Sequence, residues 1–121
     1  MKFASVRLVT QQFESLIQFY QNLLTVEPRH LAPGFAQIHV DGLVLAISDE
    51  RLIGLYNNGL AVAASNRSAI LEFQVGDVAA VLGRVSSAAV AMPVTKMPWG
   101  NTSALLHDPD GNLVNIFSVP E

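Results

Sequence analysis

The order of strand and helix patterns in the first half of this chain of 121 residues recurs in the second half. Each half reads as one strand, one helix and three further strands, at about residues 2–48 and 68–119, with a connector at 49–67. Elements in this order predict sheets that carry a helix on one face and are open on the other. We therefore expect a single α+β domain over residues 1–121, with two βαβββ repeats forming a half-open barrel around a cleft.

The first half changes its hydrophobic period along the chain. Residues 3–9 are β-prone, and apolar residues at helical spacing predict an amphipathic helix over 12–24. An Asp-Gly pair at 41–42 separates two β-prone runs, 35–40 and 43–47. Because Asp and Gly both tolerate positive φ, this pair predicts a tight hairpin.

The second half repeats the pattern after a connector with a short helical piece around residues 51–56. Asp77 is the expected N-cap of the second helix, because its short carboxylate can accept a backbone hydrogen bond. An Asp-Pro-Asp-Gly-Asn segment at 108–112 predicts the turn of the last hairpin. The expected elements lie at residues 69–75, 77–88, 92–97, 102–107 and 113–119.

Composition excludes several classes of function. The net charge is −3 and the seven Lys and Arg residues form no run, which argues against nucleic-acid binding. There is no cysteine, hence no disulfide, thiolate metal site or cysteine nucleophile. No signal-like N-terminus or membrane span is visible, so we expect a cytoplasmic protein without membrane partners.

Apolar residues make up half of the chain, and the mean hydropathy is +0.36. This is a high proportion for a small domain, and one core does not account for all of it. The surplus predicts either a partner subunit or an apolar ligand cleft. We expect a homodimer.

Three segments carry a resemblance to a known family. Residues 19–24 (FYQNLL) look like a first-helix ending, and Trp99-Gly100 precedes a strand and the turn at 108–112. Together these segments resemble the vicinal oxygen chelate superfamily, which includes glyoxalase I, bleomycin-resistance proteins and extradiol dioxygenases. The resemblance covers essentially the whole chain and implies the glyoxalase/bleomycin-resistance fold.

The resemblance also implies where a metal would bind. Family metalloenzymes hold one divalent ion with four side chains from the first and last strands of each half. The matching positions here are Ser5, Ala46, Ile70 and Asn115. None is a good ligand, since alanine and isoleucine cannot coordinate a cation. Loss of these ligands is typical of the metal-free, ligand-sequestering branch, so we expect no metal and no cofactor.

Strand alternation and hairpin pairing predict the side chains that line the cleft. The predicted pairs include Val40 with Leu43 in the first hairpin, and His107 with Leu113 in the last. The result is a few polar groups among apolar ones, as in small-molecule sites. The candidate ligand-binding residues are Ser5, Arg7, Phe35, Gln37, His39, Val44, Ile70, Glu72, Gln74, Trp99, Leu105, His107, Asn115 and Phe117.

Several of these residues have more than one interpretation. His39 and His107 are related by the repeat and are either cleft donors, parts of an atypical metal site, or hairpin-end histidines in water. Glu72 is the best candidate for a catalytic base, because burial in an apolar cleft would raise its pKa; the alternative is an ion pair with Arg7. Trp99 either stacks on a planar ligand, closes the end of the barrel or packs on a second subunit.

Two further candidates lie in the connector, where Arg51 and Tyr56 either form a lid over the cleft or belong to a plain linker. The leading hypothesis is a metal-independent protein that sequesters a small organic molecule, such as an antibiotic. The alternative is a lyase, isomerase or dioxygenase-like enzyme that uses an atypical metal site or Glu72 as its base. A third reading is an interaction module whose cleft is filled by its own side chains.

Overall fold

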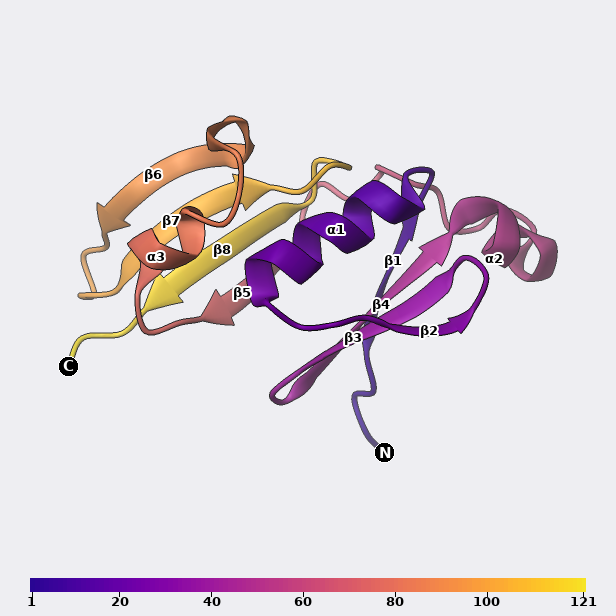
Figure 1. Cartoon of the computed structure of the whole chain (residues 1–121), viewed down its shortest axis with the longest axis horizontal. Helices are drawn as coiled ribbons and strands as arrows, with labels where there is room; N and C mark the ends of the chain where they lie inside the picture. Colours follow the sequence, from indigo (N-terminus) through magenta and orange to yellow (C-terminus); the bar gives the residue numbers. More distant parts are fainter. The chain divides into compact units, whose positions relative to one another are not determined.

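The structure, a computed structural model, describes every residue from 1 to 121. The chain divides into two compact units, Met1–Ser65 and Asn66–Glu121, and the boundary lies inside the predicted connector (Figure 1). The first unit consists of β1 (Val6–Thr10), α1 (Phe13–Leu24), β2 (Arg29–Ala32), β3 (Phe35–Val40), β4 (Leu43–Asp49) and α2 (Glu50–Asn57). The second consists of β5 (Ile70–Gln74), α3 (Val78–Leu82), the 3-10 helix η1 (Ser87–Ala89), β6 (Val90–Lys96), β7 (Thr102–His107) and β8 (Leu113–Ser118). The two βαβββ repeats of the predicted α+β fold are confirmed.

Each unit contains one open four-stranded sheet with the same topology. The strand orders are β1-β4-β3-β2 and β5-β8-β7-β6, and in each sheet the first strand runs parallel to the last. The predicted hairpin registers are confirmed: Val40 pairs with Leu43, and His107 pairs with Leu113. Gly42, at the first of these turns, has φ +74°. Glycine adopts a positive φ readily, which is why the Asp-Gly pair predicts a tight turn here.

The core of the first unit lies between α1 and one face of its sheet. Leu16 and Tyr20 on the helix are fully buried, as are Ile38 and Leu45 on β3 and β4, the strands that α1 contacts. Burial alternates along β3, so its other face is left without α1. This is the covered-and-open arrangement that the sequence predicts.

The first strand starts later than predicted. β1 begins at Val6 rather than at residue 3, because its parallel ladder with β4 starts with Val6 opposite Leu45. Phe3 lies outside the ladder and is 81% exposed. A β-prone sequence without a ladder partner gains no hydrogen bonds, so the expected extension to residue 3 is wrong.

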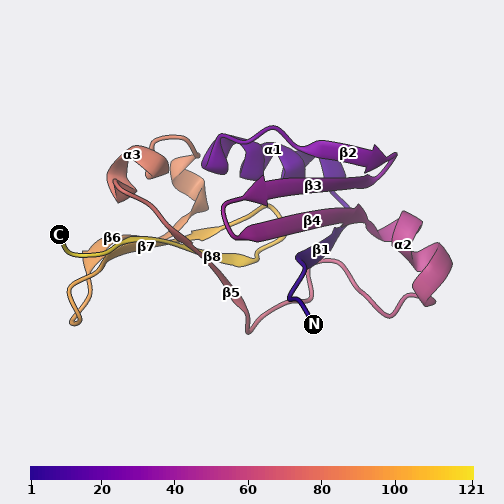
Figure 2. The same cartoon turned by 90° about the horizontal axis from the view of Figure 1, so that it is seen from below.

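The second unit has a smaller core under a much shorter helix. Val78 and Val81 of α3 are buried, together with Leu106, Val114 and Ile116 of β7 and β8, the strands that α3 contacts. Figure 2 shows α3 on one side of β6, β7 and β8. Asp77 caps α3 as predicted, since its Oδ1 accepts a hydrogen bond from the backbone N–H of Ala80 at 3.1 Å.

The predicted length of this second helix is wrong. Helix α3 ends at Leu82 instead of continuing to residue 88. After Gly83 the backbone closes i to i−3 hydrogen bonds, from Arg84 to Val81 and from Val85 to Leu82. Glycine is a poor helix former, and the hydroxyl of Ser86 accepts from Ala88 N and begins the separate helix η1.

The turn between β7 and β8 is held by a buried carboxylate. Asp108 Oδ1 accepts from the backbone N–H groups of Asp110 and Asn112 at 2.9 Å each, and its Oδ2 accepts from Asn112 Nδ2 at 2.8 Å. Asn112 Oδ1 in turn accepts from Asn66 Nδ2 at 3.3 Å. The sequence predicts residues 108–112 only as a turn. In the structure this segment also holds the start of the second unit in place through Asn66.

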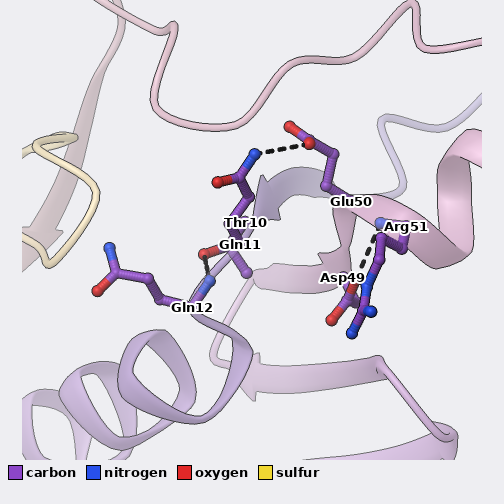
Figure 3. A network of polar contacts seen from close by, with 6 residues as sticks. All are labelled: Thr10, Gln11, Gln12, Asp49, Glu50 and Arg51. Carbon is purple, nitrogen blue, oxygen red and sulfur yellow. Dashed lines mark hydrogen bonds and ion pairs between the residues drawn. The ribbon is translucent and has the colours of Figure 1, made fainter.

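The connector is attached to the first unit by a second carboxylate (Figure 3). Glu50 accepts from Gln11 Nε2 at 2.9 Å through Oε1 and from the backbone N–H of Ala63 at 2.7 Å through Oε2. The pKa of Glu50 is lowered from its ordinary value, mainly by the Ala63 hydrogen bond and then by that of Gln11. Helix α2 is thus joined to the end of β1, although none of its residues is buried. No helix in the structure combines the length and apolar character needed to cross a bilayer.

Candidate functional site

The candidate residues of the first unit share the face of its sheet that α1 leaves uncovered, which we call the first open face. Arg7 and Gln37 lie in one row across the sheet, each opposite Ala46. His39 and Val44 form the next row. The structure therefore places these side chains as the alternation predicts. Ser5 is the exception, because it precedes β1 and is not part of the ladder.

Polar and aromatic groups on the first open face contact one another. The guanidinium of Arg7 lies 4.7 Å from the ring centroid of Phe35, a cation–π geometry. His39 Nε2 is 3.1 Å from Gln37 Oε1, so that nitrogen donates its proton to the amide oxygen. A ligand on this face meets a cation, an amide and an imidazole beside the apolar Val44.

The second open face is the equivalent surface of β5–β8. Glu72, Asn115 and Leu105 form its central row, because β8 pairs with both β5 and β7. Ile70 and Gln74 flank Glu72 on β5 and are exposed. The remaining members of the rows are Leu113, Phe117, Ser103 and His107. Apolar side chains thus surround one carboxylate and one amide.

The carboxylate and the amide are joined directly. Asn115 Nδ2 donates to Glu72 Oε2 at 2.8 Å. Asn115 Oδ1 is buried and has no hydrogen-bond partner. A buried acceptor without a donor lowers the stability of the fold by about 1–3 kcal/mol, so such an oxygen is unusual. No pattern in the sequence predicts it.

Glu72 is an exposed side chain, and its Oε2 accepts a hydrogen bond from the amide of Asn115. The proposal that Glu72 acts as a base rested on burial in an apolar surrounding, and the structure does not provide that burial. The role of Glu72 as a base stays a prediction, without the burial from which it was argued. What remains is an ionisable acceptor held in place by a neighbouring amide.

Trp99 belongs to the tight turn that precedes β7. Gly100 N donates to Met97 O at 2.9 Å, and Gly100 has φ +99°. A Cβ at this glycine would lie 2.9 Å from Pro120 Cγ, which explains why glycine follows the tryptophan. The indole itself is 70% exposed, so Trp99 does not close the core of its own unit. Stacking on a ligand or packing on a second subunit remain its two interpretations.

The positions that the family resemblance assigns to metal ligands supply no suitable set. Ala46 and Ile70 have no donor atoms, and Ser5 offers one neutral hydroxyl. Asn115 offers an amide oxygen that is buried against the protein and an amide nitrogen that is engaged with Glu72. These residues do not fit a divalent cation, which prefers carboxylate, imidazole or thiolate ligands.

The two histidines do not form part of a metal centre in either unit. No group of three or more His, Cys, Asp or Glu side chains that could hold a metal ion is present. His39 is paired with Gln37 on the first open face, and His107 is an exposed side chain at the end of β7. Both histidines lie at hairpin ends, in the register that the hairpin pairing predicts.

The lid residues of the connector are directed into solvent. The Arg51 side chain is 94% exposed and lies 4.0 Å from Asp49 Oδ1, and Tyr56 is 80% exposed. Sequence reasoning missed the residue that does organise this segment, Glu50, because a lone glutamate at a helix start has no distinctive signal.

One hollow lies away from the open faces. It is shallow, has a volume of about 500 Å³, and lies on the outer surface of α1. Its lining consists of Glu14, Ser15, Gln18, Phe19 and Asn22. The residues come from a single helix and no other element closes the hollow, so it lacks the walls of a ligand site.

Comparison with protein families found one match across nearly the whole chain. The model of the Glyoxalase/Bleomycin resistance protein/Dioxygenase superfamily matches residues 2–116. A comparison with curated proteins found no match.

Solved structures show the same fold. A glyoxalase-related enzyme from Fulvimarina pelagi is 24% identical, with a TM-score of 0.84 over 99% of this chain and 89% of its own. A glyoxalase/bleomycin resistance protein/dioxygenase family enzyme from Burkholderia phytofirmans PsJN is 16% identical, with a TM-score of 0.85 over 99% of this chain and 100% of its own. A glyoxalase/bleomycin resistance protein/dioxygenase from Nocardioides is 22% identical, with a TM-score of 0.77 over 100% of this chain and 85% of its own. Identities this low establish a common fold and leave the activity open.

Proposed function

The chain belongs to the Glyoxalase/Bleomycin resistance protein/Dioxygenase superfamily, and from that premise we propose that it binds a small, partly planar organic molecule without a metal ion. The observation that carries the proposal is the donor-poor set at the expected metal positions, above all Ala46 and Ile70. Members of a family built around a metal can keep the fold and its binding surface when the ligands are lost. Antibiotics with aromatic groups are the ligand class we propose to test first.

The composition of the two open faces supports binding. Phe35, Val44, Leu105 and Phe117 are half-buried, so each leaves part of an apolar surface available on its own sheet. The polar groups among them are few and fixed, for example the Glu72–Asn115 pair. Apolar surface with sparse, oriented polar groups is the usual make-up of a small-molecule site.

A thermal-shift screen with glycopeptide, quinone and peptide antibiotics tests this function. A ligand present at about 100 times its dissociation constant adds roughly 2.7 kcal/mol to the free energy of unfolding. Phe117→Ala, on the second open face, should weaken binding of any ligand found. Val119→Ala removes an exposed apolar side chain beyond the end of β8 and serves as the matched control. Absence of stabilisation by every aromatic compound would contradict the proposal.

Metal independence has its own test. Protein purified without chelator should contain no stoichiometric zinc, iron, manganese or nickel by elemental analysis. Added divalent ions should leave both the melting temperature and ligand affinity unchanged. A stoichiometric metal that is lost in His39→Ala or His107→Ala would instead support an enzyme with an atypical metal site.

We also propose a homodimer. The connector exposes four large apolar side chains in one short stretch, Leu55, Tyr56, Leu60 and Val62, each at least 61% exposed. Exposed apolar side chains in such a cluster are typical of a protein contact. Sedimentation velocity should show a dimer at micromolar concentration, and Leu60→Ser should weaken it. A monomer at all concentrations would contradict this proposal and leave the ligand-binding function untouched.

A further inference from the structure

The polar centre of the second open face is a carboxylate with one oxygen that accepts a hydrogen bond and one that does not. Glu72 Oε2 accepts one hydrogen bond, from Asn115 Nδ2 at 2.8 Å, and its Oε1 accepts none. Asn115 Oδ1 also accepts none, although it is buried. The face therefore presents an exposed carboxylate that has unused acceptor capacity and is held in place by the Asn115 amide.

The orientation of the Asn115 amide is fixed by chemistry. With the amide turned over, its oxygen would face the Glu72 carboxylate, placing two acceptors together without a proton between them. The amide nitrogen must therefore point to Glu72, and the oxygen must point away from it. Asn115 therefore acts as the donor that positions the carboxylate, and the acceptor available on this face is Glu72.

No positive group of the second unit neutralises the pair. The ion pair between Arg51 and Asp49 lies in the connector, and no ion pair joins a cation to Glu72. Lys96 lies opposite Thr102, in register with residues of the other face of the sheet. His107 is the one titratable neighbour on the open face, one row away beside Leu113.

We propose that the Glu72 carboxylate, positioned by Asn115, recognises a positively charged nitrogen on the ligand, an ammonium or amidinium group attached to an aromatic or other apolar body. This inference rests on the proposed function and specifies its ligand class. A protonated amine carries several N–H donors, and one of them can donate to the free Oε1 of Glu72 while Asn115 Nδ2 holds Oε2 in place. The apolar body would lie on Leu105, Leu113 and Phe117, which flank the pair in register.

Three naphthalene probes of the same shape test the charge preference. They are naphthylmethylamine, which is cationic at neutral pH, naphthylmethanol, which is neutral, and naphthoate, which is anionic. Amide chemical-shift titrations of the full chain give a dissociation constant for each. We expect the amine to bind about threefold to fivefold more tightly than the alcohol, the range of an exposed charge pair, and the carboxylate to bind most weakly.

Matched variants assign the preference to the pair. Glu72→Gln keeps the shape and an acceptor but removes the charge, and should abolish the advantage of the amine over the alcohol. Glu14→Gln removes the same charge from the outer surface of α1 and should preserve that advantage. Asn115→Ala frees the carboxylate from its hydrogen bond and should reduce the advantage without abolishing it.

The outcomes separate the inference from the proposed function. Equal binding of amine and alcohol, or an amine advantage that survives Glu72→Gln, overturns the inference while the binding function stands. Failure of all three probes to bind at millimolar concentration counts against both. Circular dichroism of each variant confirms that a changed affinity does not reflect unfolding.

Discussion

The two repeats have the same strand order, yet they place opposite charges at equivalent positions of their open faces. Arg7 stands on the first strand of one unit opposite Ala46, and Glu72 stands on the first strand of the other opposite Asn115. Arg7 turns to the ring of Phe35, whereas Glu72 accepts a hydrogen bond from its row neighbour. The backbone of a repeat fixes where a side chain lies, and the neighbour in the row decides what that side chain can do.

The covered faces differ in scale rather than in kind. Helix α1 has 12 residues and four of them are buried, whereas α3 has 5 residues and two are buried. Both helices contact the two strands of the last hairpin in their unit. The helix therefore contributes more buried side chains to the core of the first repeat than to that of the second. Truncating a buried helix side chain should lower the free energy of unfolding more in the first repeat.

The largest predicted effect tests this difference in the cores. Leu16→Ala should lower the free energy of unfolding by about 3–5 kcal/mol, because Leu16 is 0% exposed and its removal leaves a cavity against the sheet. Val81→Ala in α3 should cost about 1–2 kcal/mol, because fewer carbons are removed from a side chain that is 6% exposed. Urea denaturation of both variants measures the two values. Equal losses would show that the short helix carries as much of the stability as the long one.

The hairpin turns provide the next comparison. Asp108→Ala should cost about 2–3 kcal/mol, because Asp108 accepts three hydrogen bonds while 4% exposed, and its loss leaves buried donors unpaired. Asp41→Ala, in the equivalent turn of the first repeat, should cost less than about 0.5 kcal/mol, because Asp41 is exposed. Thermal denaturation separates these values easily. A similar cost at both positions would mean that turn conformation, and not the buried carboxylate, provides the stability.

The sequence predicted most of the fold because local signals and long-range pairing agree. The Asp-Gly pair set the first hairpin in its observed register, and the alternation of β3 and β8 placed Gln37 and Asn115 on the open faces. The helix after Asp77 was overextended, because Val81 and Val85 have helical spacing, and the pattern does not register the weakening at Gly83. Boundaries depend on such end effects, which periodicity alone does not contain.

The candidate site was less predictable, for a physical reason. Pairing registers give the face of a side chain, but hydrogen bonds between side chains depend on rotamers that no register specifies. The bond between Asn115 and Glu72 and the contact of Arg7 with Phe35 belong to this class. In contrast, the sequence alone shows that positions 46 and 70 cannot ligate a metal, because Ala46 and Ile70 have no donor atoms.

A smaller effect is predicted for the cation of the first open face. Arg7→Met keeps much of the side-chain volume but removes the charge above the Phe35 ring, 4.7 Å from its centroid. Because Arg7 is exposed, the loss in the free energy of unfolding should be about 0.5–1 kcal/mol. Arg67→Met, in the connector, changes the net charge equally and should have no comparable effect. A loss as large as that of Leu16→Ala would show that the open face, and not only the covered one, holds the first unit together.

The smallest predicted effect concerns the carboxylate that attaches the connector to the first repeat. The pKa of Glu50 is lowered below its ordinary value of 4.5, first by the Ala63 N–H and then by Gln11. A lowered pKa in the folded chain means that the ionised form stabilises it: this contribution is present above the ordinary pKa and is lost as the pH falls through the lowered one. The difference in stability between the chain and its Glu50→Gln variant should therefore be small but measurable at neutral pH and vanish in strong acid. Denaturation series across this pH range measure it, and Glu14→Gln, where no such hydrogen bonds exist, should give a flat difference. A Glu50→Gln difference that persists unchanged in acid would show that the glutamate's shape, and not its charge, fixes the connector.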